Sequence, residues 1–190
     1  LFFPAEEEMY PAPQRYYLEP PPEHASVLDG EFRPGHFRGV ATVVLKLFNI
    51  AQPQVALFGS KDFQQLMVLR NMTQELALPI EIVAGETVRA VDGLALSSRN
   101  GYLSAQERAE APNLHRLLDG VRNAIRRGER DFARMEQEAM AELRSRGWIP
   151  DYIAVREKLG LQLPPAHDSG LVILGAALLG STRLIDNLEV

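Results

Sequence analysis

The sequence has 190 residues, 46% of them hydrophobic and 24% charged, which is typical of a folded globular protein and excludes a largely disordered chain. A formal net charge of −5 disfavours nucleic acid as the main partner, because proteins that bind nucleic acid usually present a basic face. With no cysteine and no apolar run of the ~18 residues that cross a bilayer, the sequence indicates neither disulfides nor a membrane span, and we expect a cytoplasmic protein.

The N-terminal 35 residues are expected to contribute little to the core. Leu1–Pro4 resembles the end of a buried strand with nothing before it to pair with, so we expect an upstream part of the fold to be missing from this sequence. Residues 4–35 are rich in proline, glutamate and aromatic residues, which predicts irregular surface with short extended pieces.

The next segment alternates between helix and strand patterns joined by short links. This alternation predicts parallel strands connected by right-handed crossovers, the arrangement of an α/β sheet. The predicted elements are a helix from Phe37 that Pro53 ends, a strand over Val55–Phe58, a helix over Asp62–Leu76 and a strand over Ile80–Val83.

The remaining sequence groups its helices before its strands, which predicts a small α+β domain. Ser104–Glu107 is a capping-box sequence that opens a helix, Pro112 restarts it, and Asp131 is the expected N-cap of a further helix with Met135 inward. Three strands are predicted over 152–156, 171–174 and 183–187. We place the boundary between the two parts near residue 87, giving domains over 1–87 and 88–190.

The first candidate for chemistry is Phe58–Asp62, where a parallel strand ends and a helix begins. Ligands of open α/β sheets bind at this edge, where helix N-termini offer free N–H groups to phosphates, and Lys61 adds a full charge. The alternative is structural: Asp62 and Gln65 also fit a capping box, with Lys61 simply solvated.

The second candidate is the serine-arginine segment over residues 92–100. Ser97, Ser98 and Arg99 follow a glycine turn, and two hydroxyls beside a guanidinium could hold a triphosphate. Serine-rich turns are commonly only turns, so this alternative stays open. His36 sits in a cationic segment before a helix and its role is undecided, while the four histidines have no spacing typical of a metal site.

Four segments, in order and spacing, resemble the pantothenate synthetase family. They are R-P-G-H-F-R-G-V-A-T-V-V (33–44), L-F-G-S-K-D-F-Q-Q-L (57–66), D-G-L-A-L-S-S-R-N (92–100) and T-R-L-I-D-N (182–187), and E-E-M-Y-P (7–11) also fits. The resemblance covers nearly the whole chain. It implies an incomplete Rossmann-like nucleotidyltransferase sheet, of α/β class, followed by a small α+β C-terminal domain with a counterpart of the KMSKS phosphate loop.

The resemblance also implies substrates and residue roles. Pantoate would react with Mg-ATP to give pantoyl adenylate and pyrophosphate, and beta-alanine would then displace AMP. Gln65 would hydrogen-bond pantoate, and the backbone of Val88 would meet adenine. The implied ATP-binding residues are Gly59, Ser60, Lys61, Asp62, Val88, Leu96, Ser97, Ser98 and Arg99, among which Lys61, Ser97, Ser98 and Arg99 are the implied catalytic residues.

Departures from the family pattern limit what this chain is expected to do. Ser60 stands where the family commonly has Glu, and the family's N-terminal HIGH-like segment and its early glutamine are absent from the sequence. We therefore expect half of an active site and no turnover by this chain alone. A non-catalytic fragment or dimerisation module, and a related nucleotidyltransferase with another acceptor, remain alternatives. The family's homodimer is the expected assembly.

Overall fold

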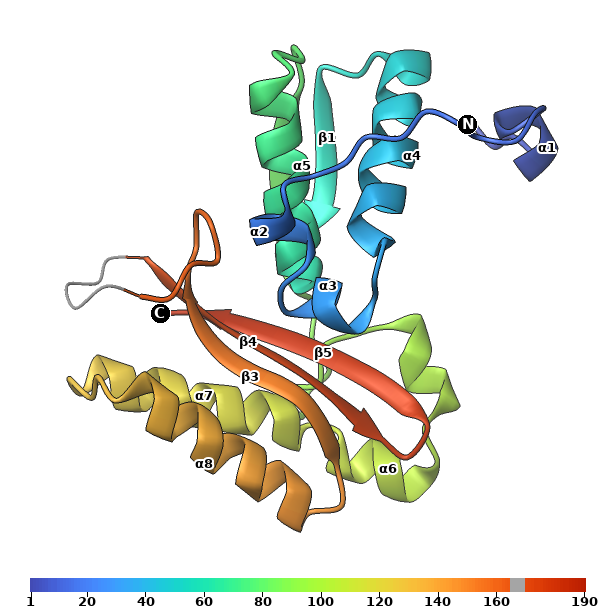
Figure 1. The fold of residues 1–190 in the computed structure, drawn as a ribbon. Coiled ribbons are helices and arrows are strands. Elements are labelled where there is room, and N and C mark those ends of the chain that lie inside the picture. The colour runs from blue at the N-terminus through green and yellow to red at the C-terminus, as the bar shows by residue number, and fades with distance from the viewer. Residues whose placement is uncertain (165–169) are drawn as a thin grey trace.

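Two separate sheets organise the chain, one parallel and one antiparallel (Figure 1). The computed structural model describes residues 1–164 and 170–190. Strand β1 (Val55–Gly59) pairs in parallel with β2 (Glu81–Gly85), and β3 (Ile149–Glu157), β4 (Leu171–Leu179) and β5 (Thr182–Glu189) form an antiparallel sheet in that order. The predicted succession of a parallel α/β part and an α+β part is confirmed.

The parallel sheet packs one face against two helices, α4 (His36–Ala51) and α5 (Phe63–Glu75). In α4 the buried side chains recur at helical spacing, which is why this sequence forms an amphipathic helix (Phe37, Ala41, Val44 and Phe48). On the opposite face of β1, Leu57 stays 71% exposed. The helix α5 connects β1 to β2, so the predicted parallel crossover is present.

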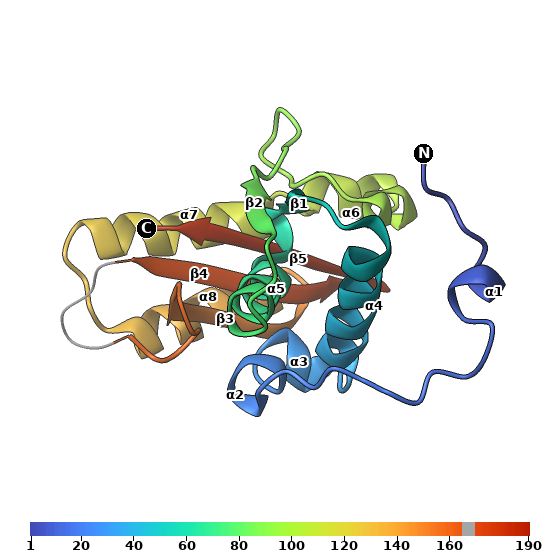
Figure 2. The same cartoon turned by 90° about the horizontal axis from the view of Figure 1, so that it is seen from above.

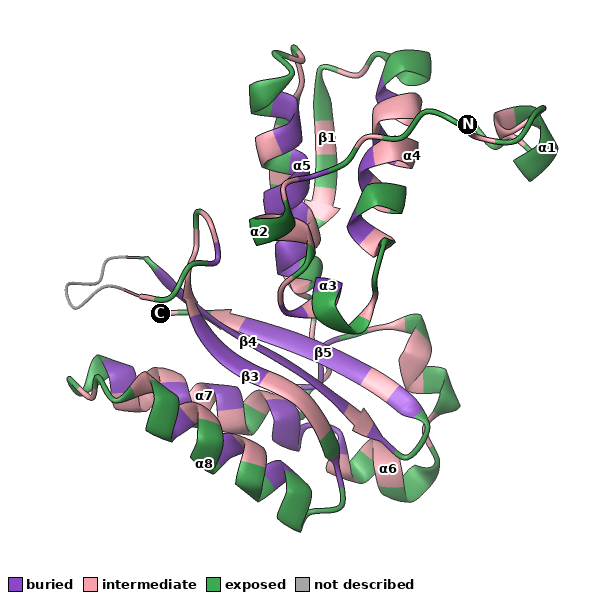
Figure 3. Cartoon of the chain, viewed as in Figure 1, coloured by how far each residue is buried: buried purple, intermediate pink, exposed green. Residues whose placement is uncertain are grey.

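The antiparallel sheet is covered on both faces, and the views in Figures 1 and 2 agree on this arrangement. Helices α7 (Asn113–Arg126) and α8 (Phe132–Ser145) pack on one face, against residues such as Ile173 and Ala177. Val172 and Leu174 point the other way, into a core shared with α4 and α5. This alternation explains why nearly all of β4 is buried (Figure 3).

The N-terminal residues differ from the prediction. They form three single-turn helices, α1 (Glu6–Met9), α2 (Pro22–Ala25) and α3 (Asp29–Phe32), rather than extended pieces. Leu28 is buried in the core shared with the antiparallel sheet, so this segment is not only a connection. The predicted buried strand at the start is wrong, because Leu1 and Phe3 are fully or largely exposed and lie outside any strand.

The remaining elements follow the predicted order with longer strands. Helix α6 (Ala105–Glu110) begins at a capping box formed by Ser104 and Glu107, as predicted. Two 3-10 helices were not predicted: η1 (Ser60–Asp62) and η2 (Ser98–Tyr102). Within the described residues, no helix combines the length and apolar character needed to cross a membrane.

Gly30 in α3 has no room for a side chain. A Cβ at this buried position would collide with the backbone carbonyl oxygen of Ala25, whereas a Cβ at Gly39 in α4 would meet nothing. We expect Gly30→Ala to lower the free energy of unfolding by about 2–3 kcal/mol, because backbone must move. Gly39→Ala is the matched control and should raise it by up to about 1 kcal/mol through helix propensity. Urea unfolding of both variants tests this, and equal effects would contradict it.

Candidate active site

The first candidate segment forms the turn between β1 and α5. Gly59 ends the strand, η1 occupies the next three residues, and α5 begins at Phe63. Asp62 is the N-cap residue of α5, yet within the described residues its side chain accepts no capping hydrogen bond. The capping-box interpretation of Asp62 and Gln65 is therefore wrong. Lys61 is partly buried and Asp62 is exposed.

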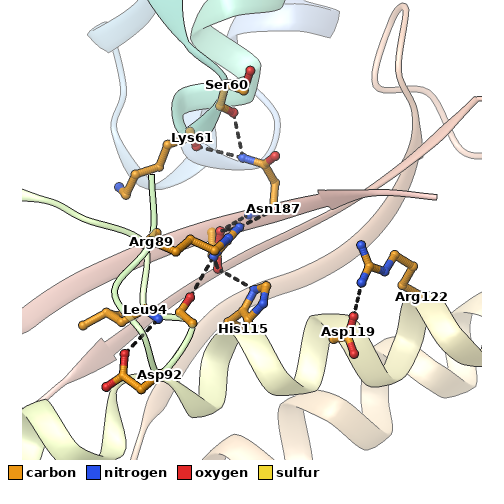
Figure 4. Close-up of polar contacts among 12 residues, drawn as sticks. Ser60, Lys61, Arg89, Asp92, Leu94, His115, Asp119, Arg122 and Asn187 are labelled. Carbon is orange, nitrogen blue, oxygen red and sulfur yellow. Dashed lines mark hydrogen bonds and ion pairs between the residues drawn. The ribbon is translucent and has the colours of Figure 1, made fainter. Parts of the chain in front are cut away.

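A buried asparagine from the last strand holds this turn in place. The side-chain amide of Asn187 in β5 donates hydrogen bonds of 2.9 Å to the backbone carbonyl oxygens of Ser60 and of Lys61 (Figure 4). Because one NH₂ group satisfies two carbonyls, the position of Lys61 is fixed by the C-terminal sheet. Two segments more than a hundred residues apart in the sequence thus meet at the site.

Asp186, next to Asn187, anchors the second candidate segment. Its carboxylate receives a bidentate pair from Arg89, at 2.7 and 2.9 Å, and lies 3.2 Å from Nδ1 of His115. Arg89 also donates to the carbonyl oxygen of Gly93 at 3.1 Å, which ties down the start of the serine-arginine loop (Figure 4). Burial would raise the pKa of Asp186, but the adjacent imidazole of His115 and the hydrogen bonds and charge of Arg89 outweigh it and lower that pKa.

The serine-arginine segment is folded back against the residues before it. The amide of Leu96 donates to the carbonyl oxygen of Val88 at 2.9 Å, and Arg89 and Ala95 form an antiparallel bridge. Ser97 is the N-cap of η2 and its hydroxyl accepts from the amide of Arg99. These contacts place Val88 beside Leu96.

The two candidate segments converge across β5, which contacts both η1 and η2. Lys61, Ser97 and Asp186 line the same small cavity of about 10 Å³. Burial lowers the pKa of Lys61, while Asp62 and Asp186 raise it and the charge of Arg99 lowers it further. Among the described residues, neither Lys61 nor Arg99 has a carboxylate within 4.0 Å, so neither cation is directly neutralised.

The comparisons with known proteins give one consistent result. The sequence profile of the pantoate-beta-alanine ligase family matches residues 1–189. The chain belongs to this family. Pantothenate synthetase from Thermus thermophilus superposes with a TM-score of 0.91 at 41% sequence identity, over 97% of this chain and 67% of that one.

A second solved structure is that of pantoate-beta-alanine ligase from Francisella tularensis, complexed with beta-gamma ATP and beta-alanine. It superposes with a TM-score of 0.76 at 31% identity, over 96% of this chain and 61% of that one. This chain therefore spans less than two thirds of the length of the Francisella protein and 67% of the Thermus protein.

The glutamine pair in α5 divides into a structural and a candidate binding residue. The buried side chain of Gln64 donates to the carbonyl oxygens of His24 and Val27 and accepts from the amide of Asp29. Gln65 is only partly buried, and in the described part of the chain its side chain makes no hydrogen bond. The side-chain amide of Gln65, unlike that of Gln64, is therefore not used to hold the described part of the fold together.

Sequence reasoning did not identify the residues that assemble the site. Asn187 and Asp186 lie in the T-R-L-I-D-N segment, but nothing in that segment alone indicates their partners. Arg89 and His115 were missed because their partner Asp186 is distant in sequence. A signal was present only in two adjacent polar residues, Asp186 and Asn187, placed between the apolar residues Ile185 and Leu188 of β5.

Replacing Asn187 by aspartate should disrupt the turn that carries Lys61. A carboxylate at this buried position would face two carbonyl oxygens and could donate to neither, so we expect Asn187→Asp to lower the free energy of unfolding by about 2–3 kcal/mol. Asn49→Asp adds the same charge at an exposed position and should cost less than about 1 kcal/mol. Urea denaturation measures both, and similar losses would show that the two hydrogen bonds contribute little.

Proposed function

We propose that this chain provides the phosphate-binding part, and a share of the pantoate-binding part, of an enzyme that condenses pantoate with beta-alanine at the expense of ATP. Membership of the family supports the reaction. A relative whose structure was solved with beta-gamma ATP and beta-alanine supports the substrates. The observation that carries the proposal for this chain is the convergence of Lys61 and the Ser97–Arg99 segment, both placed by β5.

The proposed chemistry has two steps in which all atoms are accounted for. An oxygen of the pantoate carboxylate attacks the α-phosphorus of ATP, the bond to the β-phosphate oxygen breaks, and pantoyl adenylate and pyrophosphate result. The beta-alanine amine then attacks the acyl carbon, AMP leaves with the bonding electron pair, and the amine loses a proton. Neither step requires a covalent bond to the protein, so the residues act by positioning and by offsetting charge.

Each candidate residue has a proposed contact. Lys61 and Arg99 would neutralise phosphate oxygens, and backbone N–H groups of the η1 turn, over Gly59–Asp62, would donate to them. The hydroxyls of Ser97 and Ser98 would add hydrogen bonds, while Val88 and Leu96 would border adenine. Gln65, in the first turn of α5 and close in sequence to Lys61, would hydrogen-bond pantoate.

Three further features belong to the proposal. The described residues include no group of three or more histidine, aspartate or glutamate side chains placed to hold a metal ion, so Mg²⁺ would arrive as part of the Mg-ATP substrate, bound to its phosphate oxygens. We also propose a homodimer and a cytoplasmic location, on the resemblance to the family alone.

The reaction is tested by measuring AMP released from ATP, with pantoate and beta-alanine present together and each omitted in turn. The proteins are this chain and a chimera in which the N-terminal segment of the Thermus thermophilus relative precedes Leu1. We expect AMP from the chimera only when both substrates are present, and none from the chain alone. A folded chimera that releases AMP with another carboxylic acid, or not at all, would contradict the proposal.

The pH dependence of ATP binding should report on Lys61. Burial lowers the pKa of its ammonium group below the ordinary value of 10.5, and phosphate binds the protonated form. ATP affinity should therefore fall as the pH rises through that lowered pKa, at a pH below the ordinary value of 10.5. In Lys61→Arg the charge persists through this pH, so its affinity should stay level. The test is to measure the dissociation constant of ATP against pH for the unaltered chain and for Lys61→Arg. Parallel pH profiles for the two proteins would exclude a phosphate-binding role for Lys61.

A further inference from the structure

A second cavity opens beside the serine-arginine segment. Its volume is about 320 Å³. It brings together the cationic segment before α4, the helix η2 and the turn between β4 and β5. The lining residues are Arg33, Arg99, Tyr102, Ser181, Thr182 and Arg183.

The three arginines of this cavity differ in how their charge is balanced. Arg183 is neutralised by two carboxylates, since its Nη2 lies 2.7 Å from Asp29 and its Nε lies 2.7 Å from Asp151. Within residues 1–164 and 170–190, Arg33 and Arg99 have no carboxylate within 4.0 Å and donate no side-chain hydrogen bond. Two unneutralised guanidinium groups therefore border one cavity.

The surroundings of Arg33 increase the free-energy cost of keeping its guanidinium group charged beside the other two arginines. Burial lowers the pKa of Arg33, and the charges of Arg99 and Arg183 act in the same direction, against the attraction of Asp29. The neighbouring imidazole of His36 also has a lowered pKa, first because of burial and then because of Arg33. His36 therefore adds no full charge near neutral pH, and a bound anion would be the group that relieves the repulsion between the arginines.

We propose that Arg33 and Arg99 bind the pyrophosphate group, first as the β- and γ-phosphates of ATP and then as the leaving product. This rests on the proposed function and assigns a binding role to Arg33, which lies before α4 and outside the two candidate segments. A guanidinium fork matches phosphate oxygens in pairs, and three residues that carry hydroxyl groups, Tyr102, Ser181 and Thr182, line the same cavity. Two cations and three hydroxyls suit a multiply charged polyoxyanion better than the single carboxylate of pantoate or beta-alanine.

The test is the binding of inorganic pyrophosphate to the 190-residue chain by isothermal titration calorimetry. Loss of a charged hydrogen bond pair should make Arg33→Ala bind pyrophosphate at least about tenfold more weakly. Arg33→Lys keeps the charge without the guanidinium fork, so its pyrophosphate affinity should fall between those of the unaltered chain and Arg33→Ala. Arg70→Ala is the matched control, because Arg70 is exposed and has no ion pair in the described part of the chain, and its affinity should change less than about twofold.

Two further measurements separate this inference from its alternatives. Arg33→Ala should keep the circular dichroism spectrum and melting temperature of the unaltered chain, and its affinity for AMP should not change, since AMP lacks the β- and γ-phosphates. Unchanged pyrophosphate affinity in Arg33→Ala would overturn the inference even if the chimera forms AMP. Pyrophosphate binding that depends on Arg33, together with a folded chimera that forms no AMP from ATP, pantoate and beta-alanine, would keep this site and reject the proposed function.

Discussion

The arrangement of the candidate site depends on one pair of adjacent residues, Asp186 and Asn187, near the end of β5. Asp186 holds Arg89 and with it the base of the serine-arginine segment, while Asn187 holds the η1 turn and Lys61. Burying a carboxylate is costly unless it is paired and hydrogen-bonded, and Asp186 accepts hydrogen bonds from Arg89 and from the amide of Asn187, with Nδ1 of His115 3.2 Å away. This pairing keeps Asp186 ionised, so its contribution to stability is present at neutral pH and is lost as pH falls through its lowered pKa.

The position of β5 in turn depends on contacts that join the N-terminal segment to the antiparallel sheet. Arg183, at the start of β5, pairs with Asp29 of α3 and Asp151 of β3, and the hydroxyl of Tyr152 donates to the same Asp29 carboxylate. Burial, followed by the nearby charge of Asp29, raises the pKa of Tyr152, which keeps the phenol a donor. These contacts and the shared core place both candidate segments on one framework. The two segments are therefore held in fixed positions relative to each other.

The sequence was most informative where a pattern is local. Helical spacing identified α4, the capping box identified α6, and the inward position of Met135 in α8 follows from the same periodicity. It failed where a partner is distant or where a polar residue has a tertiary role. Asp62 matched a helix-capping pattern, but its side chain accepts no capping hydrogen bond. The proline-rich N-terminal segment was predicted to be surface, but its Leu28 packs into the core. The contacts of Asp186 join residues 97 positions apart, which no local pattern encodes.

In the proposed site, Lys61 and Arg99, from different candidate segments, bind the phosphates of the same nucleotide. The most direct measurement is the dissociation constant of ATP for Lys61→Ala and for Arg99→Ala beside the unaltered chain. A charged hydrogen bond contributes about 1.5–3 kcal/mol, so each substitution should weaken ATP binding by about tenfold or more. If both variants bind ATP as tightly as the unaltered chain, Lys61 and Arg99 have only structural roles, and the site described above is not the nucleotide site.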